Sequence, residues 1–252
     1  MGHTEHYNKF FTDITKLIYF VGFGLHDAQS YEKTMRQHIE LAQTVKMEEI
    51  VVEHDKEIRK EIPDDEKKDF IKSLEDQMKN REYYFDFILS HSLIFAKSLF
   101  DNYISNVIEF IYNTYPSILT SKKKQIYYSE VFEHDTMEEL LNYIIEKELY
   151  DIGYMSFRAL ETYFEDILCL KLILDESDIK KIIKIFEIRN IYVHNNGVVN
   201  KKFIRMVKSD DYKEGDEIKL NFQLVVNYFL IIRRVTNALD MQIYNKFYKD
   251  SE

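Results

Sequence analysis

The stretch Arg189-Asn190-Ile191-Tyr192-Val193-His194, followed by Asn195-Asn196-Gly197, closes a run, 176–194, in which apolar residues recur at spacings of three, four and seven. This spacing predicts an amphipathic helix with one buried face. Asn and Gly tolerate the left-handed backbone conformation, so the three residues after His194 predict the end of that helix. The residues expected on its buried face are Ile179, Ile182, Ile183, Phe186 and Val193.

The composition of the whole chain predicts an all-α fold. Only six glycines and two prolines occur in 252 residues, whereas proteins on average contain about 7% and 5% of these residues. A chain so poor in helix breakers is expected to have few tight turns. Tyr and Phe make up 15% of it, too much for a disordered chain. We expect an antiparallel helical bundle over residues 85–252 and a helical N-terminal arm, of unknown function, over residues 1–84.

Breakers and capping residues divide the chain into further predicted helices. Gly22-Phe23-Gly24 is expected to break the first helix, and Pro63 and Pro116 are expected to end later ones. Thr136, with Glu139 three residues on, reads as a capping box. The predicted helices are 4–22, 31–62, one or two between 63 and 115, one from about 136, 157–167, 198–207, and a last one capped by Asn221.

Two cationic side chains are expected close to the end of the 176–194 helix. His194 falls in its last turn, where unpaired carbonyls favour a protonated imidazole. Arg189 adds a permanent cation with a fork of donors suited to phosphate. Five residues correspond to about 140° around a helix, so Arg189 and His194 do not share a face, whereas Asn190 and His194 do.

The segment 180–208 is strongly basic within an acidic protein. It contains eight Lys or Arg and the single acid Glu187, a net charge of +7, whereas the whole chain carries −10 and its remainder therefore −17. This asymmetry predicts an anion-binding patch. The alternative is that these residues only line the solvated face of one helix and of the loop after it.

Arg-x4-His, with a polar residue after the Arg and an Asn/Gly cluster after the His, resembles the signature of the HEPN superfamily. The resemblance covers roughly residues 85–248, including the preceding helix 157–167 and the long closing helix. It implies a helical bundle that pairs as a homodimer, and a metal-independent endoribonuclease, a hydrolase that needs no cofactor. It also implies a bacterial toxin or phage-defence system, in which an inhibitor or antitoxin protein is a further expected partner.

The resemblance also implies roles for individual residues, with two copies of the motif meeting across the dimer interface. Arg189 would stabilise transition-state charge, His194 would act as acid or base, and Asn190 would orient the phosphate or His194. Glu161, on the preceding helix, would hold Arg189 in place. Asn196 stands where some HEPN toxins carry a tyrosine that a partner nucleotidyltransferase modifies, which puts that mode of neutralisation in doubt. The residues expected to bind RNA are Lys180, Lys184, Lys201, Lys202 and Arg205.

Simpler structural roles for these residues, and other protein classes, are alternatives to this interpretation. His194 would otherwise cap the helix by bonding its last carbonyls, and Arg189 would form a salt bridge with Glu161 or Glu187. A metal enzyme would need clustered ligands, a nucleotide-binding enzyme a glycine-rich loop, and a helix-turn-helix protein a basic chain; none of these patterns is present. The main alternative is a non-catalytic HEPN-like module for dimerisation or RNA binding.

The remaining features bear on the compartment. The single cysteine, Cys169, excludes an internal disulfide, and its leucine neighbours predict burial. No apolar stretch approaches 18 residues and no secretory signal is visible, so a cytoplasmic protein without a membrane span is expected.

The N-terminal histidines have no metal-ligand spacing and are expected at the surface; they are His3, His6, His26, His38 and His54.

Overall fold

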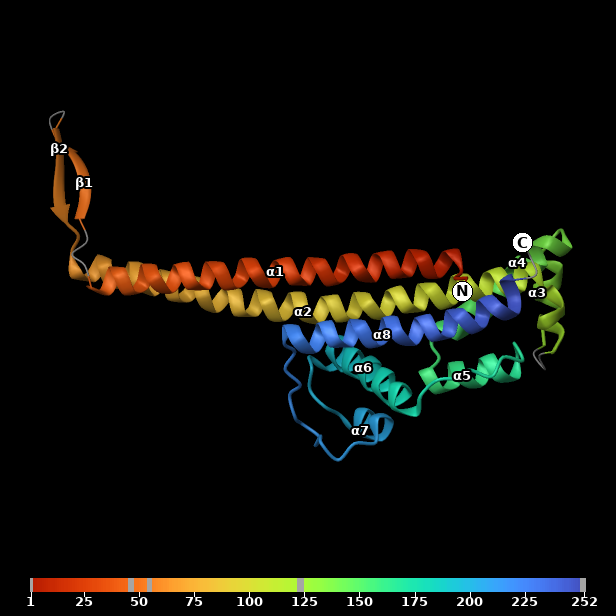
Figure 1. The fold of residues 1–252 in the computed structure, drawn as a ribbon. Coiled ribbons are helices and arrows are strands. Elements are labelled where there is room, and N and C mark those ends of the chain that lie inside the picture. Colours follow the sequence, from red (N-terminus) through yellow and green to blue (C-terminus); the bar gives the residue numbers. More distant parts are fainter. Residues whose placement is uncertain (1, 45–47, 54–55, 122–124, 250–252) are drawn as a thin grey trace. The chain divides into compact units, whose positions relative to one another are not determined.

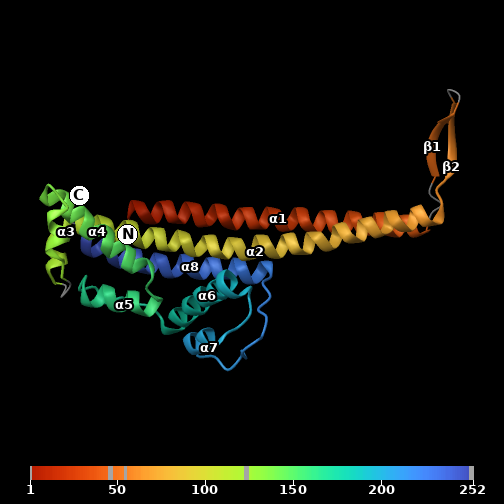
Figure 2. The same cartoon turned by 180° about the vertical axis from the view of Figure 1, so that it is seen from behind.

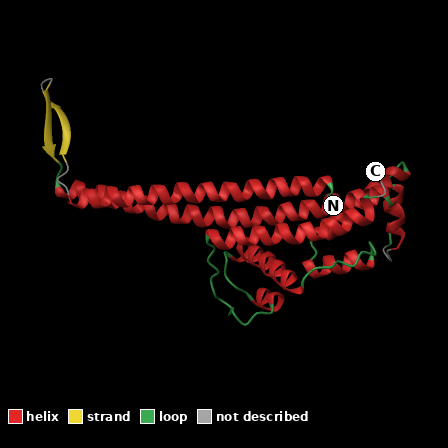
Figure 3. Ribbon diagram, viewed as in Figure 1, coloured by secondary structure: helices red, strands yellow, loops and turns green. Residues whose placement is uncertain are grey.

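The computed structural model describes residues 2–44, 48–53, 56–121 and 125–249 of the chain (Figure 1). Helices make up most of these residues, so the predicted all-α class is confirmed (Figure 3). The elements are α1 (Glu5–Thr44), β1 (Glu48–Glu53), β2 (Lys56–Glu61), α2 (Asp64–Thr114), the 3₁₀-helix η1 (Pro116–Ser121), α3 (Tyr128–Phe132), α4 (Met137–Gly153), α5 (Phe157–Asp166), α6 (Glu176–Asn195), α7 (Lys201–Val207), α8 (Phe222–Ile243) and the π-helical turn η2 (Tyr244–Tyr248).

The chain forms two compact units. One, which we call the core unit, combines Met1–Ile18 with Ser92–Glu252, and the other, the hairpin unit, is Tyr19–His91. Helices α1 and α2 each contribute to both units. These units divide the chain elsewhere than at the expected boundary between residues 84 and 85, and the first 18 residues belong with the C-terminal part of the chain.

The predicted break at Gly22-Phe23-Gly24 is wrong, because α1 is a single helix of 40 residues that runs through these glycines. Four of the buried residues of α1 are separated by seven or fourteen residues, which keeps them on one stripe of the helix; they are Ile14, Val21, Met35 and Ala42. A glycine inside a helix costs only about 1 kcal/mol relative to alanine. Burial of this stripe therefore outweighs the two glycines.

The predicted helix 31–62 is wrong in its second half. Helix α1 ends at Thr44, and β1 and β2 pair antiparallel, with Glu48 opposite Glu61 and Glu53 opposite Lys56. The β-branched run Ile50-Val51-Val52 favours a strand over a helix. In the hairpin unit the two strands connect α1 to α2. The hydroxyl of Tyr31 on α1 donates a hydrogen bond of 3.2 Å to the side chain of Gln77 on α2.

The predicted boundaries of α2 are confirmed. Its first turn carries Asp64, Asp65 and Glu66, and the carbonyl of Pro63 accepts the first helical hydrogen bond from the Lys67 N–H, at 3.0 Å. Acidic side chains are favourable there because the helix N-terminus carries partial positive charge. The helix ends at Thr114, two residues before Pro116.

Helix α8 lies at the centre of the core unit. Asn221 caps it as predicted, since its side-chain oxygen accepts the Leu224 N–H at 2.9 Å. Apolar residues of one face are buried, with Val225, Phe229 and Ile232 fully inaccessible. Helix α6 packs against α8, α7 and α5. Figures 1 and 2 show α5, α6 and α7 on the same side of α8.

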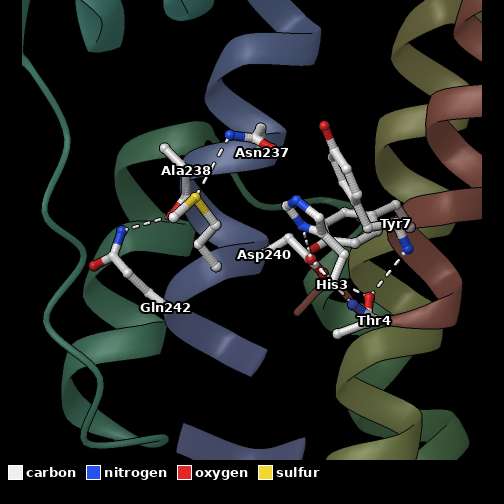
Figure 4. A network of polar contacts seen from close by, with 9 residues as sticks. His3, Thr4, Tyr7, Asn237, Ala238, Asp240 and Gln242 are labelled. Atoms are coloured by element: carbon white, nitrogen blue, oxygen red, sulfur yellow. Dashed lines mark hydrogen bonds and ion pairs between the residues drawn. The ribbon is translucent and has the colours of Figure 1, made fainter. Parts of the chain in front are cut away.

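The residues before α1 are joined to α8 through the buried carboxylate of Asp240 (Figure 4). Its two oxygens accept hydrogen bonds from the Thr4 hydroxyl (2.5 Å), the Thr4 N–H (3.1 Å) and the Tyr103 hydroxyl (3.0 Å). The Nδ1 atom of His3 lies 2.9 Å from the same carboxylate, and the His3 ring stacks on Tyr7.

Predictions for the isolated histidines and the cysteine are only partly confirmed. His26 and His38 are exposed as predicted, and His54 lies outside the described residues, but His3 and His6 are half-buried because both pack against aromatic rings. The predicted burial of Cys169 is wrong: it is exposed, at a left-handed φ of 47°. The chain turns there, and the Lys246 ammonium donates to its carbonyl at 2.5 Å.

Candidate active site at the end of α6

Helix α6 begins and ends where the sequence predicts, within one residue. At its start the Asp175 carboxylate accepts the Ser177 N–H at 2.6 Å. At its end Asn196 adopts the left-handed conformation (φ 48°, ψ 38°), and the N–H groups of Asn196 and Gly197 both donate to the carbonyl of Ile191. The last carbonyl groups of a helix have no N–H partner within the helix, and these two bonds supply donors to one of them.

The buried face of α6 differs in part from the predicted stripe. Ile179, Ile182 and Phe186 are buried as predicted, but Val193 is 41% exposed. Four consecutive residues, 185–188, are buried, because α6 packs against α8, α7 and α5 and so has more than one covered side. One of the four is Glu187, a carboxylate only 7% exposed.

Arg189 is half-buried, and its guanidinium is oriented by its neighbour on the helix. Its Nη1 donates to the side-chain oxygen of Asn190 at 3.2 Å, and the Asn190 amide nitrogen donates to Glu187 at 3.4 Å. The Nε of Arg189 is buried and has no hydrogen-bond partner among the described residues. Within the described part of the chain, Arg189 forms no ion pair. Asn190 therefore bonds Arg189, and not His194.

Glu161 does not hold Arg189 as expected. Its carboxylate pairs with Arg158, at 3.1 Å, one turn earlier on α5. Arg158 also contacts Glu176 at the start of α6, so the two helices are joined through Arg158. A basic residue at i−3 on the same helix reaches Glu161 more directly than a residue of α6 does.

His194 lies exposed in the last turn of α6. Among the described residues its side chain has no hydrogen bond, and backbone N–H groups bond the Ile191 carbonyl in the last turn. The helix is continuous from Arg189 to His194, so the expected separation of about 140° around the axis applies. One copy of the chain therefore presents the guanidinium and the imidazole on different sides of α6.

Sequence reasoning missed two charged residues of α2 that lie where this helix contacts α6. Lys97 forms an ion pair with Asp101, and its Nζ lies 4.7 Å from the centre of the Phe186 ring, one turn before Arg189. Burial lowers the pKa of Lys97, an effect that the Arg189 charge increases and that Asp101 opposes. Burial raises the pKa of Asp101, while the cations Lys97 and Arg189 act in the opposite direction.

A small cavity adjoins this charged pair. It has a volume of about 20 Å³ and is lined by Lys97, Asp101 and Ser105 of α2, Met155, and Phe186 of α6, among others. Such a volume fits about one water molecule. A ligand larger than a water molecule would therefore bind to the surface next to the cavity rather than inside it.

The basic residues expected to bind RNA are spread over more than one surface. Lys180 and Arg189 are nine residues apart on α6, which places them on opposite sides of the helix. Lys184 is half-buried, with its ammonium 4.8 Å from the ring centre of Tyr212. The others are exposed on α7: Lys201, Lys202 and Arg205. The structure thus gathers these cations around α6 and α7 without placing them all beside Arg189.

No three His, Cys, Asp or Glu side chains are grouped as metal ligands in the part of the chain that the structure describes. No helix there is both long and apolar enough to cross a bilayer. Comparisons with protein-family models, with curated proteins and with solved structures found no match. Any function must therefore be inferred from the chemistry of this site.

Proposed function

We propose that this protein is a metal-independent endoribonuclease in which Arg189 and His194 act on the scissile phosphate. The observation that carries the proposal is a half-buried guanidinium that has no carboxylate partner in the described ranges of the chain, five residues before an exposed imidazole at a helix end. Cleavage of RNA needs the 2′-hydroxyl activated, the charge on the phosphorane stabilised and the leaving 5′-oxygen protonated. An imidazole supplies proton transfer, and a guanidinium supplies charge.

The surroundings of Arg189 favour an anionic ligand. Buried polar groups are rarely left without partners, and a desolvated cation is stabilised by a negative charge. The Nε–H of Arg189 bonds no residue that the structure describes, while Asn190, itself bonded to Glu187, fixes the orientation of the guanidinium. A phosphate accepting two parallel hydrogen bonds from the fork would satisfy Arg189.

A second copy of the chain would complete this site. Because Arg189 and His194 point about 140° apart, one α6 does not bring both to a single phosphate. Two α6 helices meeting in a homodimer would place the imidazole of one copy near the guanidinium of the other. The exposed cations of α7 would then contact the RNA backbone. A nuclease of this kind acts in the cytoplasm, as in toxin or phage-defence systems, under the restraint of an inhibitor or an activating signal.

The test is cleavage of labelled RNA by purified protein in EDTA, with the oligomeric state measured by light scattering. We expect His194→Ala and Arg189→Ala each to lower the rate by about 100-fold or more. His38→Ala and Arg36→Ala change the same residue types at exposed positions of the hairpin unit, and they should cleave at the wild-type rate.

Equal cleavage by all variants would place the activity in another site or in a contaminant. RNA binding by the wild type without cleavage, across several RNAs, would contradict the nuclease and support the adaptor module. A monomer that cleaves at full rate would contradict the shared site.

A further inference from the structure

The Lys97–Asp101 pair on α2 is held in a defined position. The two residues are one helical turn apart, and the Lys97 side chain is only 15% exposed. Its ammonium lies above two aromatic rings, 4.7 Å from the centre of Phe186 and 5.9 Å from that of Phe100. Cation–π attraction and the carboxylate of Asp101 both act on the same ammonium. The pair thus lies at the packing contact between α2 and α6.

Arg189 is close enough to interact electrostatically with both members of this pair. It follows Phe186 by three residues on α6 and so projects from the same side of the helix as the ring beneath Lys97. Its positive charge acts to lower the pKa of both Lys97 and Asp101. Glu161 is bonded to Arg158 and Glu187 to Asn190, whereas the charge of Arg189 acts on Asp101. Among the residues that the structure describes, Asp101 is therefore the carboxylate that we take to compete for Arg189.

Arginine and carboxylate form strong bidentate pairs. If Asp101 took Arg189 as its partner, a phosphate would have to displace the carboxylate before it could bind. We propose that Lys97 is a positioning residue, which occupies the carboxylate of Asp101 and thereby keeps the guanidinium of Arg189 available to substrate. The role given to the substrate rests on the proposed function, whereas the pairing of Asp101 does not.

The proposal makes opposite predictions for one single and one double variant. Lys97→Met keeps a long apolar side chain over Phe186 but removes the ammonium, so Asp101 should turn to Arg189, and RNA cleavage should fall by about tenfold or more. Asp101→Asn in the same chain removes the competing carboxylate, and cleavage should return to the level of Asp101→Asn alone. Lys147→Met, which breaks the pair with Glu130, is the matched control and should cleave normally.

A second readout does not depend on cleavage. The Nε–Hε resonance of Arg189, identified by its absence in Arg189→Lys, reports directly on its hydrogen bonding. In Lys97→Met it should move downfield, as expected for a carboxylate partner, and in the double variant it should return. A lysine needed only for stability would lower the melting temperature without moving this resonance.

An unchanged Arg189 resonance in Lys97→Met would overturn the proposal, as would a double variant that shifts like the single one. If the wild type cleaves no RNA but the resonance moves and returns as described, the proposed nuclease fails while the positioning of Arg189 stands. If cleavage is lost in Lys97→Met and the resonance stays in place, the nuclease stands and the positioning role fails.

Discussion

Gly197 fixes the direction in which the chain leaves the helix that carries Arg189 and His194. Its φ of +79° lies in the left-handed region, and an added Cβ would lie 3.1 Å from the ring of Tyr192. The Tyr192 hydroxyl bonds the carbonyl of Ile218, whose own N–H donates to the carbonyl of Gly197 at 3.0 Å. The end of α6 is thus tied to the segment before α8.

We therefore expect Gly197→Ala to lower the free energy of unfolding of the core unit by about 1–2 kcal/mol, because an L-residue is strained in the left-handed region. Urea denaturation followed by circular dichroism measures this change. Gly24→Ala is the control, since that glycine is inside α1 with no atom within 4 Å of an added Cβ, and alanine there should stabilise by about 0.5–1 kcal/mol. Equal effects of the two substitutions would contradict the role of Gly197.

At the scale of elements, helix α3 has no buried residue and depends on polar contacts. The Glu130 carboxylate accepts hydrogen bonds from the Lys147 ammonium (2.5 Å), the Tyr127 N–H (2.9 Å) and the Tyr143 hydroxyl (2.8 Å). These donors, Lys147 first, lower the pKa of Glu130 from 4.5 to about 2. The ionised form is therefore favoured in the folded protein.

A group whose pKa is lowered on folding stabilises the protein above its unfolded pKa and ceases to do so as the pH falls through the folded value. The melting temperature of the wild type should thus exceed that of Glu130→Gln at pH 6. The difference should shrink as the pH falls from 4.5 towards about 2. Calorimetry across this range tests the prediction, and a difference that stays constant with pH would exclude it.

Local signals predicted much of the secondary structure. Thr136 and Glu139 form the expected capping box, with the Glu139 N–H donating to the Thr136 hydroxyl oxygen at 3.1 Å. Such a cap depends on neighbouring residues alone, so sequence reveals it. Gly22 and Gly24 predicted a break in the first helix. That prediction failed because burial of one stripe of a 40-residue helix outweighs the effect of two weak helix breakers.

For the candidate site too, features that depend on neighbouring residues were predicted and a contact between distant helices was not. The end of α6 follows from Asn196 and Gly197, so the positions of Arg189 and His194 on the helix were predicted correctly. The Lys97–Asp101 pair was not predicted, because its place beside Arg189 depends on Phe186 packing on α2, about 90 residues away in sequence. The i,i+4 spacing alone is typical of any solvated helix face.

At the scale of the whole chain, the Asp240 network connects residues near its two ends. Thr4 precedes α1, Tyr103 belongs to α2 and Asp240 to α8, so one carboxylate joins three parts of the core unit. All three side chains are at most 2% exposed. The donors that meet Asp240 have little access to water and depend on this single acceptor group.

Asp240→Ala should therefore destabilise the core unit by about 3–5 kcal/mol, since it leaves the Thr4 N–H and hydroxyl and the Tyr103 hydroxyl buried without an acceptor. Hydrogen exchange should quicken for the amides of residues 4–18, which lose their connection to α8. Asp178→Ala is the matched control, because Asp178 pairs with the half-exposed Arg234 and Lys181, and such a pair contributes at most about 1 kcal/mol. If Asp240→Ala were no more damaging than Asp178→Ala, the first turn of α1 would have to be held by the packing of Tyr7 and Phe10 on Tyr103 instead.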